Sequence, residues 1–190
     1  VHRIIMGDEA HFDLSGTVFD RRNVRFWGTQ NPRICRARIA QGAPHVTVWC
    51  GVSSNGFLGP YFFEDPETRR CVSVTGERYR DMIEHYVMPR LRDDRRFVGK
   101  RGSRRDRWWW WQQNGATAHT ARETMTLLRR AFGAERLISL GSRFPWPSRS
   151  PDLSAADYFL WGYLKDRVYD NGVVDAARLK TSIEREVNAL

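Results

Sequence analysis

The chain has 190 residues, of which 41% are hydrophobic and 13% aromatic, so it is long and apolar enough for one compact domain and is not a disordered tail. Its formal charge of +9 at pH 7 comes from 31 Lys+Arg against 22 Asp+Glu and favours a polyanionic partner. Nearly all of the basic residues are arginines, which bind phosphate groups bidentately. Nucleic acid is therefore favoured over anionic lipid, and a basic surface without any such partner is the alternative.

Cysteines and apolar runs exclude several other classes. Cys35, Cys50 and Cys71 are odd in number and form no C-x-x-C pair, which argues against a disulfide framework or a zinc site and favours a reducing compartment. No apolar run approaches the roughly 20 residues that a membrane span requires. The N-terminus lacks the layout of a signal peptide and begins inside an expected strand, so we expect a fragment whose N-terminal portion is absent.

The first third of the chain has the pattern of strands. Turn residues separate apolar runs at 1–6, 23–28, 45–54 and 57–63. In the third of these runs, Val46, Val48, Cys50 and Val52 alternate onto one face. We therefore expect a sheet to begin the domain.

The rest of the chain alternates helical and strand-like patterns. Helical spacing of apolar residues predicts helices around 79–87, 121–132, 157–168 and 179–190. Thr120 and Glu123 have the spacing of a capping box for the second of them. Strands are expected at 108–113 and 136–140, a basic loop at 100–107, and a Pro-rich loop at 144–154. This order predicts an α/β fold, a mixed sheet flanked by helices.

Three polar residues lie at the expected junctions. Asp8 is expected to end the first strand, Asn114 follows the Trp-rich strand, and Asp157 opens a helix after the Pro-rich loop. The ends of adjacent strands converge in such a sheet. Three oxygen ligands brought together there would hold two divalent cations, the arrangement used for in-line displacement at phosphorus.

Each of these residues also has a structural explanation. Asp8 is compatible with a solvated strand end, and alternation along a strand sends Asp8 and its neighbour Glu9 to opposite faces. Asn114 forms an Asn-Gly turn dipeptide, and Asp157 stands in a capping-box position after Ser154. His119 either packs in the core or points to the site, and packing is favoured.

Seven sequence motifs, taken together, favour the functional interpretation. The motifs, in chain order, are GDEAHFDLSG, NVRFWG, VTVWCGVSS, GPYFFE, TGERYRDMI, QQNGATAHTA and SPDLSAADYFLWGYLKDRVY. They cover nearly the whole chain and resemble the catalytic domain of mariner-type DNA transposases, especially copies dispersed in animal genomes.

The resemblance implies an RNase H-like fold and a DDE/DDD metal site that uses Mg²⁺ or Mn²⁺. Such a site nicks double-stranded DNA at transposon ends, the terminal inverted repeats, and joins the freed 3′-hydroxyl to target DNA. By position, Asp8 is the first acidic ligand, and Asp157, rather than Asp152, is the third. The second position, expected to be Asp, is Asn114 in this chain.

The resemblance also implies an organisation for the whole protein. Residues 1–190 are expected to form a single catalytic domain from which an N-terminal helix-turn-helix DNA-binding region is absent. A homodimer that pairs two DNA ends, and a nuclear location, are implied by the family alone.

Asn114 puts catalysis in doubt, because an amide brings no negative charge to a metal ion. Mutating even a residue that only supports a metal ligand lowers metal affinity or activity roughly 10- to 100-fold. We therefore expect a domain that folds and binds DNA but cleaves it poorly. The alternatives are an inactive DNA-binding or assembly remnant of a transposase, and an RNase H-like nuclease acting on RNA or hybrids.

DNA binding is expected to depend mainly on phosphate contacts and therefore on salt. Each candidate contact is equally compatible with a solvated surface charge. The candidates are Arg21, Arg22, Arg25, Lys100, Arg101, Arg104 and Arg105.

Overall fold

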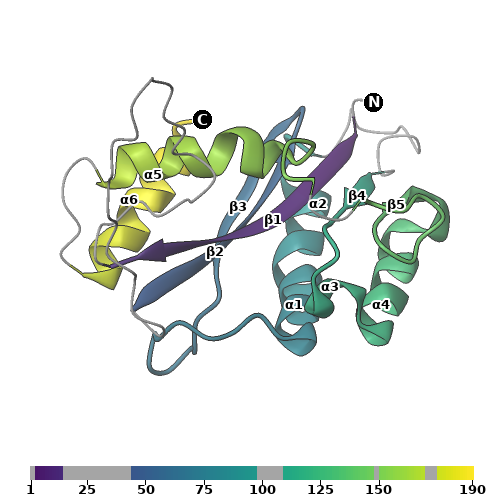
Figure 1. Ribbon diagram of the computed structural model, residues 1–190, viewed down its shortest axis with the longest axis horizontal. Coiled ribbons are helices and arrows are strands. Elements are labelled where there is room, and N and C mark those ends of the chain that lie inside the picture. The colour runs from purple at the N-terminus through teal and green to yellow at the C-terminus, as the bar shows by residue number, and fades with distance from the viewer. Residues whose placement is uncertain (1–2, 15–43, 98–108, 148–149, 170–174) are drawn as a thin grey trace, which may run out of the picture.

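A computed structural model describes residues 3–14, 44–97, 109–147, 150–169 and 175–190. In this part of the chain, five strands form one mixed sheet in the order β3-β2-β1-β4-β5 (Figure 1). The strands are β1 (Ile4–Asp13), β2 (His45–Ser53), β3 (Gly56–Phe62), β4 (Trp110–Gln112) and β5 (Leu137–Ile138). The predicted α/β fold class is confirmed.

The pairing of β1 differs on its two sides. β1 pairs with β2 in antiparallel fashion as far as Asp13, opposite His45, whereas its parallel pairing with β4 stops at Met6, opposite Gln112. The prediction that Asp8 ends the first strand is therefore wrong. Asp8 lies in the middle of a strand that is longer than predicted, just beyond the point where β4 stops pairing with it.

The helices follow the predicted order. The first helix is continuous from α1 through α2, and the middle turn of this helix is π-helical. A π-helical turn likewise leads directly into α5. The helical segments are α1 (Gly76–Asp81), η1 (Met82–Val87), α2 (Met88–Asp93), α3 (Thr117–Thr120), α4 (Arg122–Phe132), η3 (Ala134–Arg136), η4 (Ala156–Leu160), α5 (Trp161–Tyr169) and α6 (Ala176–Asn188).

An aromatic core covers one face of the sheet. Trp49 stacks on Trp111 with ring centroids 5.9 Å apart, and Trp111 stacks on Phe132 of α4 at 5.0 Å. The helix from α1 to α2 adds Tyr79, Met82, Ile83 and Val87, which are fully buried. The helix predicted around 79–87 is confirmed, and these four residues form its buried face.

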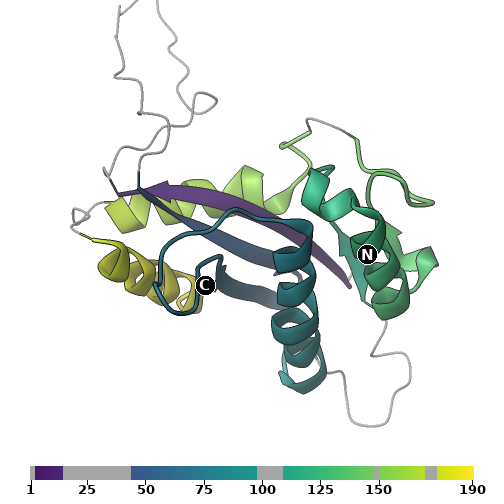
Figure 2. The same ribbon diagram turned by 90° about the horizontal axis from the view of Figure 1, so that it is seen from below.

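An aliphatic core covers the other face. Val46, Val48 and Cys50 of β2 form one cluster with Leu160 of η4, Leu164 of α5, and Leu179 and Ile183 of α6. Two views at right angles show α5 and α6 at one end of the molecule and α4 at the other (Figures 1 and 2). The last helix was predicted to extend to Leu190, but α6 ends at Asn188 and Leu190 is 43% exposed.

Some predictions lie outside the described residues. These include the strand at 23–28, the basic loop at 100–107, and the candidate DNA contacts from Arg21 to Arg25 and from Lys100 to Arg105. Within the described ranges, every helix is too short or too polar for a membrane span.

Candidate active site

Strand register brings Asp8 and Asn114 together. Met6 pairs with Gln112, and each site residue lies two positions further along its strand direction. Parallel strands keep equal steps in register, so the two side chains meet where β4 stops pairing. The Asn114 Nδ2 group donates a hydrogen bond to Asp8 Oδ1 at 3.0 Å.

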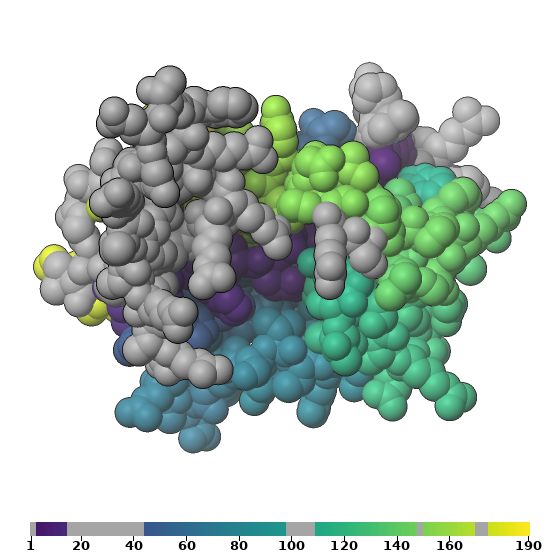
Figure 3. Space-filling model, viewed as in Figure 1, coloured from purple at the N-terminus to yellow at the C-terminus, as the bar shows by residue number. Residues whose placement is uncertain are grey.

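Asp157 of η4 lies at the same pocket as Asp8 and Asn114. It lies exposed in the first turn of η4, and together with Asp8 and Asn114 it lines a pocket of about 310 Å³. In Figure 3, purple atoms of the first strand lie near the centre of this face. Light green atoms of the segment near residue 155 lie above them, and teal-green atoms of the segment near residue 115 lie to their right. The structure therefore brings the three predicted site residues to one cavity.

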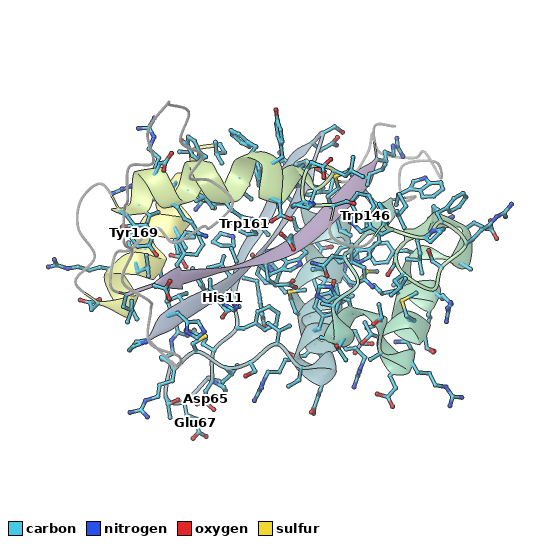
Figure 4. All side chains as sticks on the ribbon, in the orientation of Figure 1. His11, Asp65, Glu67, Trp146, Trp161 and Tyr169 are labelled. Atoms are coloured by element: carbon cyan, nitrogen blue, oxygen red, sulfur yellow. The ribbon has the colours of Figure 1, made fainter. Side chains whose placement is uncertain are left out.

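Trp161 fixes the carboxyl group of Asp8. This residue follows Asp157 by one helical turn, and its Nε1–H donates to Asp8 Oδ2 at 2.9 Å. Figure 4 shows Trp161 beside the middle of β1, and Trp146, which also lines the pocket, nearer the N-terminal end of that strand. Sequence reasoning placed Trp161 in the core only, although a helical spacing of four residues from Asp157 signals a shared face.

Burial changes the acidity of Asp8. The residue is 6% exposed, and its pKa is raised to about 7 because the charged form loses water and faces the negative charge of Asp157. The hydrogen bond from Trp161 works in the opposite direction and limits the rise in this pKa. A carboxyl group of this kind takes up either a proton or a cation near neutral pH.

The oxygen of Asn114 faces away from Asp8. Asn114 Oδ1 accepts a hydrogen bond from the backbone N–H of Ala116 at 3.0 Å and lies 2.9 Å from His119 Nδ1. The contact with Ala116 is an Asx turn, in which the Asn side chain bonds to the backbone two residues on, and it replaces the tight chain reversal that the Asn-Gly dipeptide predicted. Turning the amide over would set its N–H groups against the Ala116 N–H. Asn114 therefore presents a hydrogen-bond donor, not an oxygen, at the position facing Asp8.

His119 packs and also contacts the site. Its ring is 1% exposed and lies on Tyr79 with centroids 4.2 Å apart, as the favoured packing prediction requires. The same ring contacts Asn114 through Nδ1 and Glu9 Oε1 through Nε2, the latter at 3.0 Å. Sequence reasoning missed Glu9, because alternation correctly sends it to the face opposite Asp8, where His119 meets it.

These contacts set what the site can hold. Asp8 and Asp157 supply carboxylate oxygens, which suit Mg²⁺ and Mn²⁺, but the second expected ligand position presents an amide nitrogen. Among the described residues there is accordingly no cluster of three or more His, Cys, Asp or Glu side chains suited to a metal ion. The donor set fits a divalent cation at two positions and does not fit it at Asn114.

Comparison with solved structures identifies the architecture. No protein-family model and no curated protein matches the chain. The crystal structure of the Mos1 mariner transposase catalytic domain matches all of the chain at a TM-score of 0.65 and 17% identity, and 71% of that domain is covered. The chain has the fold of the Mos1 mariner transposase catalytic domain.

Structures of larger Mos1 assemblies match as well. A pre-cleavage Mos1 transpososome gives a TM-score of 0.68 at 17% identity, and a Mos1 paired-end complex with the left transposon end gives 0.64 at 19%. The chain is covered completely in both, but it spans only 49% and 48% of those Mos1 chains. The expected RNase H-like sheet, with its flanking helices, is thus confirmed, and the resemblance to the mariner catalytic domain holds along the whole chain.

Proposed function

We propose that this chain is a mariner-type transposase catalytic domain whose DNA cleavage and strand transfer are impaired by Asn114. The observation that carries the proposal is the convergence of Asp8, Asn114 and Asp157 on one pocket of a Mos1-like fold. Mos1 structures include a paired-end complex, a strand transfer complex and catalytic domains with Mn or Mg. These structures are of Mos1, and their likeness in fold to this chain supports a two-metal phosphodiester chemistry for it.

In this proposal the residues at the pocket have distinct roles. Asp8 and Asp157 would hold Mg²⁺ or Mn²⁺, and Trp161 keeps the Asp8 carboxyl group turned toward the pocket. Bound divalent ions supply activation of the attacking oxygen and stabilisation of the leaving 3′-oxygen. Asn114 leaves one ligand position without charge. Its Nδ2–H also donates a hydrogen bond to Asp8 Oδ1, an oxygen that a cation would need as a ligand.

Double-stranded DNA is the proposed partner. The formal charge of +9 suits a phosphate backbone, and the substrates are transposon terminal inverted repeats and target DNA by resemblance. A homodimer that pairs two DNA ends, and nuclear action, are part of the same proposal.

An inactive DNA-binding or assembly remnant is a second candidate function, favoured by the contact between Asn114 and Asp8. The hydrogen bond from Asn114 to Asp8 ties up the central carboxylate without a metal ion, as expected of a domain retained for DNA binding or assembly after catalysis was lost. This remnant differs from the impaired enzyme in one respect, because restoring an acid at position 114 gives it no activity.

Nicking of supercoiled plasmid DNA with Mn²⁺ tests the proposal. The unaltered chain is compared with Asn114→Asp and with the double variant Asn114→Asp/Asp157→Ala. We expect Asn114→Asp to nick at least about 10-fold faster than the unaltered chain, and the double variant to fall back to the unaltered rate. Equal rates in all three forms would establish the remnant. Preferential cleavage of an RNA–DNA hybrid by Asn114→Asp would establish the nuclease acting on RNA or hybrids.

A further inference from the structure

A buried chain of polar groups runs behind the pocket from Glu9 through His119 to Asn114. His119 Nε2 lies 3.0 Å from Glu9 Oε1, and His119 Nδ1 lies 2.9 Å from Asn114 Oδ1. The side chains of Glu9 and His119 are 14% and 1% exposed, so water competes little for these contacts. None of the roles given to Asp8, Asn114 and Asp157 uses this chain of contacts.

The direction of the hydrogen bond at Asn114 follows from its neighbours. The backbone N–H of Ala116 has to donate to Asn114 Oδ1, which fixes that atom as the oxygen and Nδ2 as the group facing Asp8. An oxygen cannot donate, so His119 carries a proton on Nδ1 and donates it to Asn114. The contact between Nε2 and Glu9 Oε1 needs a second proton between these two atoms, because neither an unprotonated nitrogen nor a carboxylate oxygen can donate.

His119 is itself held in place by its surroundings. Its ring lies on Tyr79 at a centroid distance of 4.2 Å, and its backbone oxygen accepts from Gln113 Nε2 at 2.9 Å. Gln113 is fully buried and also accepts from Tyr79 Oη at 3.0 Å and from Trp111 Nε1 at 3.2 Å. The ring therefore has little freedom to turn, and its Nδ1 proton marks a fixed point beside position 114.

We propose that His119, held by Glu9, is the positioning residue for the side chain at position 114. Its Nδ1–H and the Ala116 N–H together hold one atom of that side chain, which leaves the other atom facing Asp8. With Asn the free atom is a donor that bonds to Asp8. With Asp the same two donors hold one carboxylate oxygen and turn the second oxygen into the pocket. This second consequence rests on the proposed function, whereas the positioning itself does not.

The test separates the two ring nitrogens of His119. Asn at position 119 places its amide nitrogen where Nδ1 lies, and Gln places its amide nitrogen where Nε2 lies. His119→Asn thus retains the contact to Asn114, and His119→Gln retains the contact to Glu9. The readout is the solvent exchange of the Asn114 side-chain NH₂ group in ¹⁵N-labelled protein, assigned by its disappearance in Asn114→Asp.

We expect His119→Gln to speed this exchange roughly fivefold, the scale of one lost hydrogen bond, and His119→Asn to leave it nearly unchanged. Circular dichroism melting shows whether both variants fold. Equal exchange in the two variants would overturn the proposal. If either variant fails to fold, long-range ¹H–¹⁵N spectra of His119 in the unaltered chain decide, because an unprotonated Nδ1 contradicts the positioning contact.

A second readout connects the positioning to metal binding. In the Asn114→Asp background, adding His119→Gln should weaken Mn²⁺ binding, measured by calorimetry with the metal alone, by at least about 10-fold. Adding His119→Asn should weaken it much less. Because the NH₂ exchange needs neither metal nor DNA, failure of Asn114→Asp to bind Mn²⁺ would count against the proposed function and leave the positioning role standing.

Discussion

Asp8 is a carboxyl group almost wholly removed from water beside a second carboxyl group, Asp157. Its pKa of about 7 is well above the ordinary value of 3.8. Between these two pH values the folded state keeps a proton that the unfolded state has released. The contribution of Asp8 to the free energy of unfolding therefore falls as pH rises from about 4 to about 7 and stays lost above pH 7.

Titration of the Asp8 side-chain carbon by ¹³C NMR should give a midpoint near 7, and Asp8→Asn identifies the signal. In urea unfolding, the free energy of unfolding of Asp8→Asn should rise relative to that of the unaltered chain as pH increases from about 4 to about 7, by a few kcal/mol at most. A midpoint near 4 would mean that Asp8 is not buried beside Asp157 as described.

Single residues also show how far sequence reasoning reaches into the site. The positions of Asp8, Asn114 and Asp157 were readable from motifs, and the structure brings all three to one pocket. The partners of those residues were not readable. Glu9 lies on the other face of β1 from Asp8, and its contact with His119 depends on where α3 ends relative to the sheet, which no local pattern encodes.

At the scale of elements, the aromatic core depends on the close packing of Ile5 and Trp49 against Gly51 of β2. A methyl group added at Gly51 would lie 2.9 Å from Ile5 Cγ2 and 3.0 Å from the Trp49 ring. Gly51 in β2 therefore gives Trp49 room to lie flat against its neighbours on that face. Gly162 in α5, in contrast, has no atom within 4 Å of such a methyl group.

Gly51→Ala should lower the free energy of unfolding by about 1 to 3 kcal/mol, because the buried strands must separate to admit the methyl group. Gly162→Ala is the matched control and should raise it by roughly 0.5 to 1 kcal/mol, because alanine favours an open helical position. Urea unfolding of both variants is the measurement. Equal effects of the two substitutions would contradict the described packing between β1 and β2.

Periodicity predicted the type and order of the described elements, because each amphipathic face has a core to cover. Periodicity did not predict the end of a strand or helix where that end depends on contacts with a neighbouring element. Asp8 was expected at a strand end, yet β1 continues to Asp13 because β2 pairs with it throughout. Thr120 and Glu123 predicted a capping box, but α4 begins after Ala121 without a side-chain cap, and the Thr120 hydroxyl donates to the backbone of Ala116.

At the scale of the whole molecule, the formal charge of +9 predicts binding to DNA through phosphates. Each phosphate contact contributes about 0.9 to the slope of log Kd against log salt concentration. Replacing Lys100, Arg101, Arg104 and Arg105 with Gln should reduce this slope for duplex DNA by up to about 3 to 4.

Arg92→Gln/Arg185→Gln is the control, because these surface arginines pair with Asp93 and Glu186 at 2.9 and 3.0 Å. We expect little change in its slope. Fluorescence anisotropy over a range of salt concentrations gives both values. The basic segment is not a DNA contact if the fourfold replacement leaves the slope as it was.

The amide of Asn114 decides whether the two converging carboxyl groups of Asp8 and Asp157 become a metal site. Calorimetry of Mn²⁺ binding tests this most directly, on the unaltered chain, on Asn114→Asp, and on Asn114→Asp/Asp8→Ala. Asn-Gly sequences deamidate, so the intact mass of each sample must first show that Asn114 is unchanged. We predict that Asn114→Asp binds Mn²⁺ at least about 10-fold more tightly and that Asp8→Ala removes the gain. Equal binding by all three forms would contradict the assignment of this pocket as a transposase active site.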